Sequence, residues 1–327
     1  METCKSPRMV MRAALALAER ALPTYSCKFS RHDYTLPQLF ACLTAREMFN
    51  RSYRGTEALL RDSPEWLADI GLDHAPDHNT LCRAFGVIVT LRRVNKMLDV
   101  TAEWFTEARV LELTKKPLAA DSTHFESHHV SRHYERRQKQ TAEKQQNAQR
   151  PGEAAKTTKS PDKTGSHTRG DTTKKLPKAT FAIAAACHLV LAVSVSTGAG
   201  SDAPSFDGLL YDAWRRAPVK VVVADAGFDS EKNHRIARLD MCVRSIIPPQ
   251  IGRPRKDGGP PAGRFRRLMH YRFKRKADKK IYGQRWQSET VNSMIKRNQS
   301  SALRARTPER RECEMLLRAV VHNVQLA

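Results

Sequence analysis

The chain has 327 residues, 40% of them hydrophobic, which is long enough for two or three domains and too apolar for wholesale disorder. Its formal net charge of +23 predicts attraction to a polyanion such as DNA. The seven cysteines form no C-x-x-C pair, and no apolar run is long enough to cross a membrane. The composition therefore favours a cytoplasmic protein with reduced thiols and excludes a disulfide framework.

Residues 1–110 predict an all-α domain for DNA binding or dimerisation. The segment MVMRAALALAER has the pattern of an amphipathic helix. Further helices are marked by polar capping residues that precede apolar periodicity. They are expected over 36–48, over 55–60, after Ser63 and Pro64, and over 78–88 following Asp77.

Turns at Gly71 and Pro76 between short helices suggest a helix-turn-helix arrangement. The residues that its second helix would present to a major groove are His78, Asn79, Thr80 and Arg83. A helical packing domain without base contacts gives the same pattern, so both interpretations stay open.

Five apolar segments after residue 110 predict a mixed β-sheet. They cover 117–124, 179–187, 189–197, 220–227 and 243–249. The second and third would form a hairpin, whereas residues 205–216 have the pattern of a crossover helix before the fourth strand. The predicted fold class is therefore α/β, with a mixed sheet flanked by helices.

Residues 134–178 are nearly free of large apolar side chains and rich in Gln, Lys, Thr and Gly. Such a segment cannot fold alone, so we expect a flexible basic insertion that either contacts DNA non-specifically or serves only as a linker. The interval from Asp225 to Glu289 leaves room for one strand and a basic loop, without a large β-rich insertion.

The sequence T-P-E at residues 307–309 predicts the start of a last helix, which we expect to end at Leu326. Its apolar face is expected to pack against the sheet. His322 and Asn323 on this helix are expected to satisfy local backbone groups rather than to act chemically.

Asp121 and Asp225 each follow an apolar strand, at the edge where α/β sheets present catalytic groups. A third carboxylate, Glu289, lies on a helix predicted downstream. Three carboxylates gathered at one place repel one another unless a cation lies between them. Oxygen ligands favour Mg²⁺ or Mn²⁺ over Zn²⁺, and a pair of such ions activates a hydroxyl to attack a phosphodiester.

Glu289 shares a predicted helix face with Arg285, Asn292 and Lys296, since the four residues are spaced i, i+4, i+7 and i+11. A carboxylate flanked by cations suits a metal beside phosphates. A solvated helix with weak ion pairs is the alternative for this pattern alone. Clusters of Lys and Arg between residues 244 and 297 add enough charge to neutralise several phosphates.

These residues stand in three blocks that resemble the DDE transposases of bacterial cut-and-paste insertion sequences. The blocks are DSTHFESHH around Asp121, ADAGFDSEKNH around Asp225, and Y-x2-R-x3-E-x6-K from Tyr282 to Lys296. The resemblance extends from about residue 36 to the end of the sequence. It implies an RNase H-like catalytic domain formed by 111–133 and 179–327.

The resemblance implies that Asp121, Asp225 and Glu289 are a metal-binding catalytic triad with Mg²⁺ (or Mn²⁺) as the cofactor. The residues that it implies as DNA contacts are Tyr282, Arg285 and Lys296, to which we add Asn292 and Arg297 on the same helix. The implied reaction is hydrolytic nicking, followed by attack of the released 3′ hydroxyl on target DNA. Double-stranded DNA is thus the expected partner, and a homodimer is expected to bridge the two ends of the element.

Two other functions share these residues. An RNase H-like nuclease would use the same carboxylates and stop at hydrolysis. A catalytically inactive descendant would keep the basic surface and bind DNA without turnover.

Overall fold

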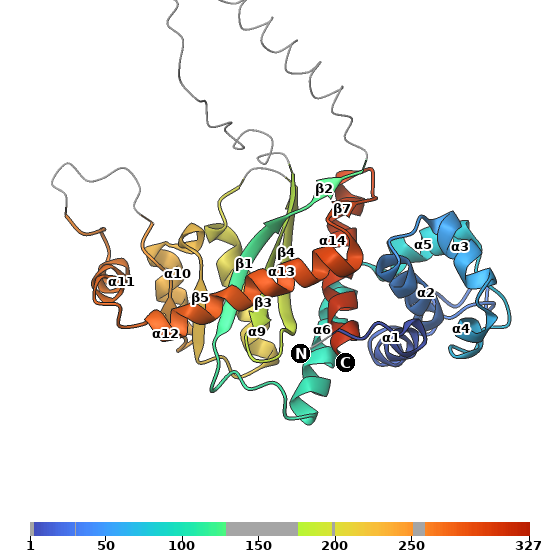
Figure 1. Cartoon of the computed structure of the whole chain (residues 1–327), viewed down its shortest axis with the longest axis horizontal. Coiled ribbons are helices and arrows are strands. Elements are labelled where there is room, and N and C mark those ends of the chain that lie inside the picture. The colour runs from blue at the N-terminus through green and yellow to red at the C-terminus, as the bar shows by residue number, and fades with distance from the viewer. Residues whose placement is uncertain (1–2, 30, 129–175, 198–199, 251–258) are drawn as a thin grey trace, which may run out of the picture.

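The computed structural model describes residues 3–29, 31–128, 176–197, 200–250 and 259–327. The first part of the chain is helical, as predicted (Figure 1). Its helices are α1 (Pro7–Ala21), α2 (Leu36–Met48), α3 (Tyr53–Arg61), α4 (Pro64–Ala68), α5 (His78–Ile88) and α6 (Leu91–Glu107). No helix among the described residues has both the length and the apolar character needed to cross a membrane.

Polar caps fix the starts of the helices that the sequence located best. At α2, the Thr35 hydroxyl accepts a hydrogen bond from the Gln38 backbone N–H, and the Gln38 side chain accepts one from the Thr35 backbone. At α5, Asp77 Oδ1 accepts from the backbone N–H groups of Asn79 and Thr80. Ser63 stands at the start of α4 as expected but makes no capping hydrogen bond with its side chain.

The central sheet has the strand order β4-β3-β1-β5-β6. Its strands are β1 (Leu118–His124), β3 (Pro177–Ala184), β4 (Val190–Thr197), β5 (Val221–Ala224) and β6 (Arg244–Ile246). Strand β3 is antiparallel to both β1 and β4, whereas β1, β5 and β6 are parallel. The hairpin and the crossover helix, α9 (Phe206–Arg216), are therefore confirmed, and the mixed α/β class is correct.

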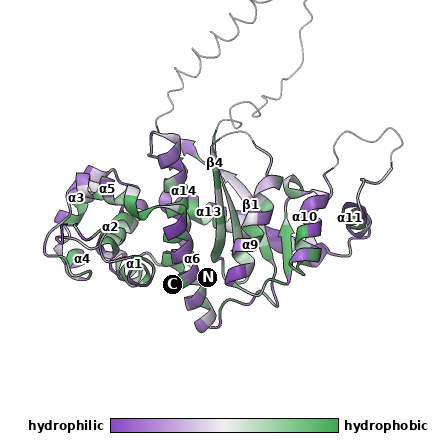
Figure 2. Ribbon diagram, turned by 180° about the vertical axis from the view of Figure 1, so that it is seen from behind, coloured by the Kyte–Doolittle hydropathy of each residue, from purple (hydrophilic) through white to green (hydrophobic). Residues whose placement is uncertain are grey.

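The sheet is covered on both faces by apolar side chains that alternate along its strands. Ala119 and Val223 belong to one buried cluster, together with residues of α13 (Trp286–Gln299) and α14 (Pro308–Leu326). Leu118 and Val222 belong to a second cluster that contains the buried face of α9. Figure 1 shows α13 lying across the sheet, and Figure 2 shows the hydrophobic colour along β4.

The N-terminal helices share a buried cluster with the C-terminal helix α14. Ala14 of α1 and Phe40 of α2 belong to the same cluster as Val320 of α14. Helix α14 also contacts α6 and β4. The prediction that the last helix packs against the sheet is therefore confirmed, and the same helix also packs against α1 and α2.

The segment between β5 and α13 contains more helix than the sequence indicated. Its elements are η2 (Ala226–Phe228), α10 (Glu231–Arg235), η3 (Ile236–Asp240), β6, α11 (Arg264–Lys274), α12 (Lys279–Tyr282) and η4 (Gly283–Arg285). The expected single strand is present among the described residues, but the expected basic loop was wrong in part because α11 is a helix. Phe265 and Met269 stand one turn apart on α11 and are both buried, which anchors this otherwise polar helix.

Two short strands form a second, two-stranded sheet after the end of β1. Strand β2 (Glu126–Ser127) pairs in parallel with β7 (Ala302–Leu303), just before α14. The end of the predicted insertion was placed too late, since Pro177 and Lys178 belong to β3. The rest of that insertion, up to residue 175, lies outside the described residues.

Candidate active site

Asp121 and Asp225 lie side by side on the neighbouring parallel strands β1 and β5, but only Asp225 follows the end of its strand. Asp121 lies in the middle of β1, because this strand continues its pairing with β3 as far as His124, so the prediction that Asp121 ends a strand was wrong. Ala120 of β1 pairs with Ala224 of β5, and each of these alanines is directly followed by one of the two aspartates. Adjacent strands lie about 4.8 Å apart, so the two side chains emerge close together. The Asp225 carboxylate accepts a hydrogen bond of 2.6 Å from the Ala226 backbone N–H, which starts the turn after β5.

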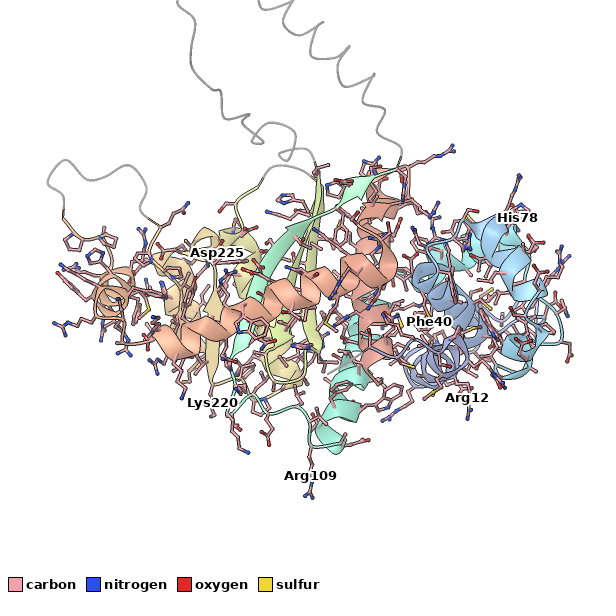
Figure 3. All side chains as sticks on the ribbon, in the orientation of Figure 1. Arg12, Phe40, His78, Arg109, Lys220 and Asp225 are labelled. Atoms are coloured by element: carbon pink, nitrogen blue, oxygen red, sulfur yellow. The ribbon has the colours of Figure 1, made fainter. Side chains whose placement is uncertain are left out.

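Helix α13 lies across β1 (Figure 3), and side chains of this helix contact Asp121. Asn292 Nδ2 donates to Asp121 Oδ2 over 3.2 Å, and Arg285 Nη1 lies 3.9 Å from the same oxygen. Ser288 Oγ lies 3.4 Å from it, but its hydrogen bond of 2.6 Å to the Arg285 carbonyl is the better one. Asp121 thus has one weak donor and one distant cation.

Glu289 lies one turn after Arg285 on α13, and the two side chains form an ion pair. Arg285 Nη2 lies 2.5 Å from Glu289 Oε1, and the Glu289 side chain is 58% exposed. Arg285 therefore bridges Asp121 and Glu289. Within the described ranges, no three His, Cys, Asp or Glu side chains form a group that could hold a metal ion.

The pKa of Asp121 nevertheless depends on both of the other carboxylates. Burial raises the pKa of Asp121 to about 6, and Arg285 opposes this shift. The charges of Asp225 and Glu289 raise the pKa further. The oxygen donors and their mutual repulsion fit a hard divalent cation such as Mg²⁺ or Mn²⁺.

Tyr282 approaches the same group from the end of α12. Burial raises the pKa of its hydroxyl, Arg285 lowers it, and the charges of Asp225 and Asp121 raise it. Its ring packs edge-on against Phe273 of α11, with the ring centroids 5.0 Å apart. The structure therefore brings Tyr282, Arg285 and Asn292, which the sequence predicted as DNA contacts, close to the carboxylates.

The other two predicted DNA contacts lie further along α13. Lys296 places its ammonium 5.6 Å from the centroid of the Phe125 ring, and burial lowers its pKa. Arg297 is exposed and donates from Nε to the Ser293 carbonyl over 3.4 Å. Both cations lie toward β2, beyond the residues that touch Asp121.

A polar network beside the site was missed by the sequence reasoning. Lys178 Nζ of β3 donates to Asp202 Oδ1 over 2.6 Å, and Ser122 Oγ donates to the same oxygen over 2.8 Å. A Cβ added at Gly227, two residues after Asp225, would lie 3.1 Å from Asp202 Oδ2. Asp202 therefore supports the turn that carries Asp225. Its position in an irregular segment gave no periodic signal.

A Ser-His-Asp arrangement occurs close to this turn but is enclosed. His234 Nδ1 lies 2.8 Å from Ser245 Oγ, and His234 Nε2 lies 3.4 Å from Asp229 Oδ1. His234 and Ser245 are fully buried, so no substrate reaches them. Arg266 Nε donates to Asp229 Oδ2 over 2.8 Å, which ties α11 to this cluster. We assign these residues to the packing of α10, β6 and α11.

Comparison with known proteins gives one family. The family model described as Transposase DDE domain matches residues 112–324, which is more than half of the chain. No curated protein and no solved structure matches the chain significantly.

Proposed function

Because the chain belongs to the transposase DDE domain family, we propose that it binds the terminal inverted repeats of its own insertion sequence and moves that element by metal-dependent strand cleavage and transfer. The observation that carries this proposal is the adjacent placement of Asp121 and Asp225, which directly follow the paired residues Ala120 of β1 and Ala224 of β5, next to the helix with Glu289. The strand order and the antiparallel β3 support an RNase H-like core.

Asp121, Asp225 and Glu289 are the residues that would hold the metal. Bound there, Mg²⁺ or Mn²⁺ would activate the attacking oxygen and stabilise the leaving oxygen of a phosphodiester. The raised pKa of Asp121 supports this role, because a buried carboxyl close to two other carboxylates gains from a neighbouring cation. Glu289 must first leave its ion pair with Arg285.

Arg285 gains a second partner in this scheme. Once Glu289 turns away, the guanidinium keeps only the distant contact to Asp121 and can donate to a phosphate of the element's end. Tyr282 lies beside it and supplies a hydroxyl for the same strand. Lys296, Asn292 and Arg297 extend the contact along α13.

The chemistry consists of two phosphoryl transfers on these residues. In the first, water attacks a phosphodiester at the element's end, and the P–O bond to the 3′ oxygen breaks to release a 3′ hydroxyl. In the second, that hydroxyl loses its proton and attacks a target phosphodiester, whose own 3′ oxygen leaves. One bond forms and one breaks in each step, so no nucleotide cofactor is consumed.

The N-terminal helices would supply binding to the repeats, with residues 1–110 as the DNA-binding or dimerisation domain and 111–133 with 179–327 as the catalytic domain. Helix α5 begins with His78, whose backbone N–H and ring both bond Glu57. Arg83 on the same helix is exposed. We propose that α5 lies toward DNA as part of a helix-turn-helix arrangement, and that a homodimer brings the two ends together.

The decisive experiment measures strand joining. Purified protein is incubated with Mn²⁺ or Mg²⁺, a labelled duplex carrying the element's terminal repeat, and a target plasmid, beside an Asp225→Asn control. Joined products that require both metal and Asp225 establish the proposed function. Nicking without joining instead identifies a nuclease, and metal-independent binding without either reaction identifies an inactive DNA-binding descendant.

A further inference from the structure

A cavity of about 410 Å³ lies between the N-terminal helices and the start of α14, away from the carboxylates. We call it the arginine pocket. The charged residues that line it are Arg46, Arg304, Arg306, Arg310 and Glu314. Tyr53 and Phe85 supply aromatic faces, and Cys82 lies at its wall. Four cations face one carboxylate here.

The single carboxylate is already occupied by the protein. Glu314 accepts hydrogen bonds from the backbone N–H groups of Arg304 and Ala305, at 3.0 and 2.8 Å. It also forms a 3.0 Å ion pair with the buried Arg318. Arg46 is paired with Glu47, and Arg304 donates to Asn50, so the positive charge available to a ligand comes from Arg306 and Arg310.

Two of the arginines lack anionic partners. Arg310 Nη1 is buried yet has no hydrogen-bond partner, and the guanidinium lies over the Phe85 ring at 5.5 Å. Arg306 is exposed and makes no hydrogen bond or ion pair with any residue that the structure describes. An orphaned buried guanidinium is costly unless a ligand completes its hydrogen bonds.

The start of α14 adds a positive helix end to the same wall. Thr307 lines the pocket and caps this helix of 19 residues, which runs away from the pocket to Leu326. Forked guanidinium groups next to a helix N-terminus match the charge and shape of a phosphate oxyanion.

Helix α5 and the start of α14, which both contribute residues to the pocket, lie on the side of the molecule that carries the proposed active site. In Figure 3, Asp225 and His78 both lie on the upper side, whereas Lys220, Arg109 and Arg12 lie on the lower side. The start of α14 lies on the upper side as well, next to β2 and β7 (Figure 1). A duplex that reaches the carboxylates thus passes near the pocket.

From this geometry we propose that the arginine pocket binds a backbone phosphate of the element's terminal DNA, at a distance from the cleaved bond. The proposal rests on the proposed function for the identity of the DNA. Arg306 and Arg310 hold the phosphate oxygens, and the contact fixes the duplex between the helical region and the sheet.

Gly86 offers a variant that displaces one cation without removing it. A Cβ added at Gly86 would lie 2.7 Å from both terminal nitrogens of Arg310, so the guanidinium must move. The clash involves only the flexible end of a side chain, and Ala is the better residue inside a helix. Gly86→Ala is thus expected to fold as wild type while losing the Arg310 contact.

The test is a salt titration of DNA binding. Binding of the labelled terminal duplex is followed by anisotropy across a series of NaCl concentrations for wild type, Arg306→Gln and Gly86→Ala. Arg12→Gln is the matched control, since Arg12 is exposed on α1 outside the pocket. Each pocket variant should bind about tenfold more weakly at fixed salt and reduce the slope of log K against log salt by about one. Slopes equal to that of Arg12→Gln would overturn the proposal.

A footprint on Cys82 tests the same site in the unaltered protein. Alkylation is measured by peptide mass spectrometry with and without DNA, with the exposed Cys242 as the internal control. DNA should slow the alkylation of Cys82 and leave Cys242 unchanged; equal rates at Cys82 would contradict the proposal.

Two further arms separate the sources of the phosphate and the two proposals. Inorganic phosphate that stabilises wild type but not Gly86→Ala, with unchanged DNA slopes, would assign the pocket to a free ion and overturn the DNA assignment. The Asp225→Asn protein is titrated in parallel and should show the wild-type slope of log K against log salt. The binding measurement therefore tests the pocket, whereas the strand-joining measurement tests the proposed function.

Discussion

Two regions of this protein combine carboxylates with arginines and reach opposite electrostatic outcomes. In the α14 ion network, formed by Glu47, Glu314 and Arg318, every charged side chain is at most 3% exposed, and Glu314 accepts several close hydrogen bonds. At the carboxylate site, formed by Asp121, Asp225, Glu289 and Arg285, the contacts of Asp121 Oδ2 are longer: the Asn292 amide at 3.2 Å, the Ser288 hydroxyl at 3.4 Å and the Arg285 cation at 3.9 Å. The first region has one arginine for each carboxylate, since Arg46 pairs with Glu47 and Arg318 pairs with Glu314. In the second region, Arg285 is shared between Asp121 and Glu289. A shortage of donors around a partly buried carboxylate therefore distinguishes a site for an external cation from a structural ion pair.

The largest effect should come from the carboxylate site. Asp121→Asn is expected to lower strand joining by about 10³-fold or more, because a ligand of the catalytic metal is lost. The metal-free variant should be at least as stable as wild type to heat, since repulsion with Asp225 and Glu289 is removed. Strand joining and thermal unfolding are measured on the same preparation. A variant that is active but less stable than wild type would show that Asp121 stabilises the fold rather than binding the catalytic metal.

The α14 ion network should show the reverse behaviour. Arg318→Met leaves the buried Glu314 without its cation, while Glu47 keeps its ion pair with Arg46, and the loss of one partner of a buried pair costs about 3–5 kcal/mol of unfolding free energy. Denaturant unfolding measures this change. An exposed arginine, changed in Arg12→Gln, provides the control and should unfold within about 0.5 kcal/mol of wild type.

The pH dependence of stability should separate the two regions by sign. Burial lowers the pKa of His322 on α14 to about 4, so the unfolded chain binds a proton between pH 4 and 6.5 that the folded chain does not. Stability from this group therefore rises with pH across that window, by about 3 kcal/mol. Asp121 acts oppositely, because its folded pKa of about 6 lies above the usual value and stability falls as pH rises towards 6.

Variants resolve these opposing contributions. His322→Gln keeps a donor for the His188 carbonyl, which His322 Nε2 contacts at 3.0 Å, and should leave only the falling contribution of Asp121. Asp121→Asn should leave the rising contribution and steepen the curve relative to wild type. Unfolding free energies at several pH values measure both, and parallel curves for the two variants would refute the assignment.

A smaller effect should distinguish the two ends of α13. Arg285→Ala is expected to weaken binding of the terminal duplex by about 1–3 kcal/mol in the presence of metal, when Glu289 no longer holds the guanidinium. Without metal the loss should be smaller. Lys296→Ala should weaken binding equally under both conditions, since Lys296 contacts Phe125 rather than a carboxylate. Metal-independent losses for both variants would argue against the exchange of partners at Arg285.

The sequence located those parts of the fold that local physics determines. Capping at Asp77 and Thr307 and apolar runs such as VVVA located helix starts and strands to within a few residues. It also placed Asp225 at the end of β5, where such sheets carry functional groups, but it ended the first strand too early, at Asp121. Helix α11 was missed since its buried contacts, Phe265 and Met269, are sparse among cations.

Tertiary contacts account for the rest of the site. Asp202 lies next to Gly227 and Lys178 only because the chain turns back after β4, so no residue spacing in the sequence predicts these contacts. The bridging position of Arg285 between Asp121 and Glu289 likewise depends on how α13 lies across β1. The arginine pocket combines segments from α3, α5 and the start of α14, which are far apart in the chain.

The shared cluster of α1, α2 and α14 also sets an order of assembly during synthesis. Helix α14 is translated after every other described element, yet α1 and α2 bury apolar side chains against it, and the Cys4 backbone N–H donates to the Gln325 carbonyl over 2.6 Å. Contacts between the first and last helices close the longest loops in the chain and form late in folding. During synthesis, the apolar side chains of α1 and α2 therefore lack their contacts with α14 until α14 leaves the ribosome. A chain released before α14 is translated lacks these contacts permanently.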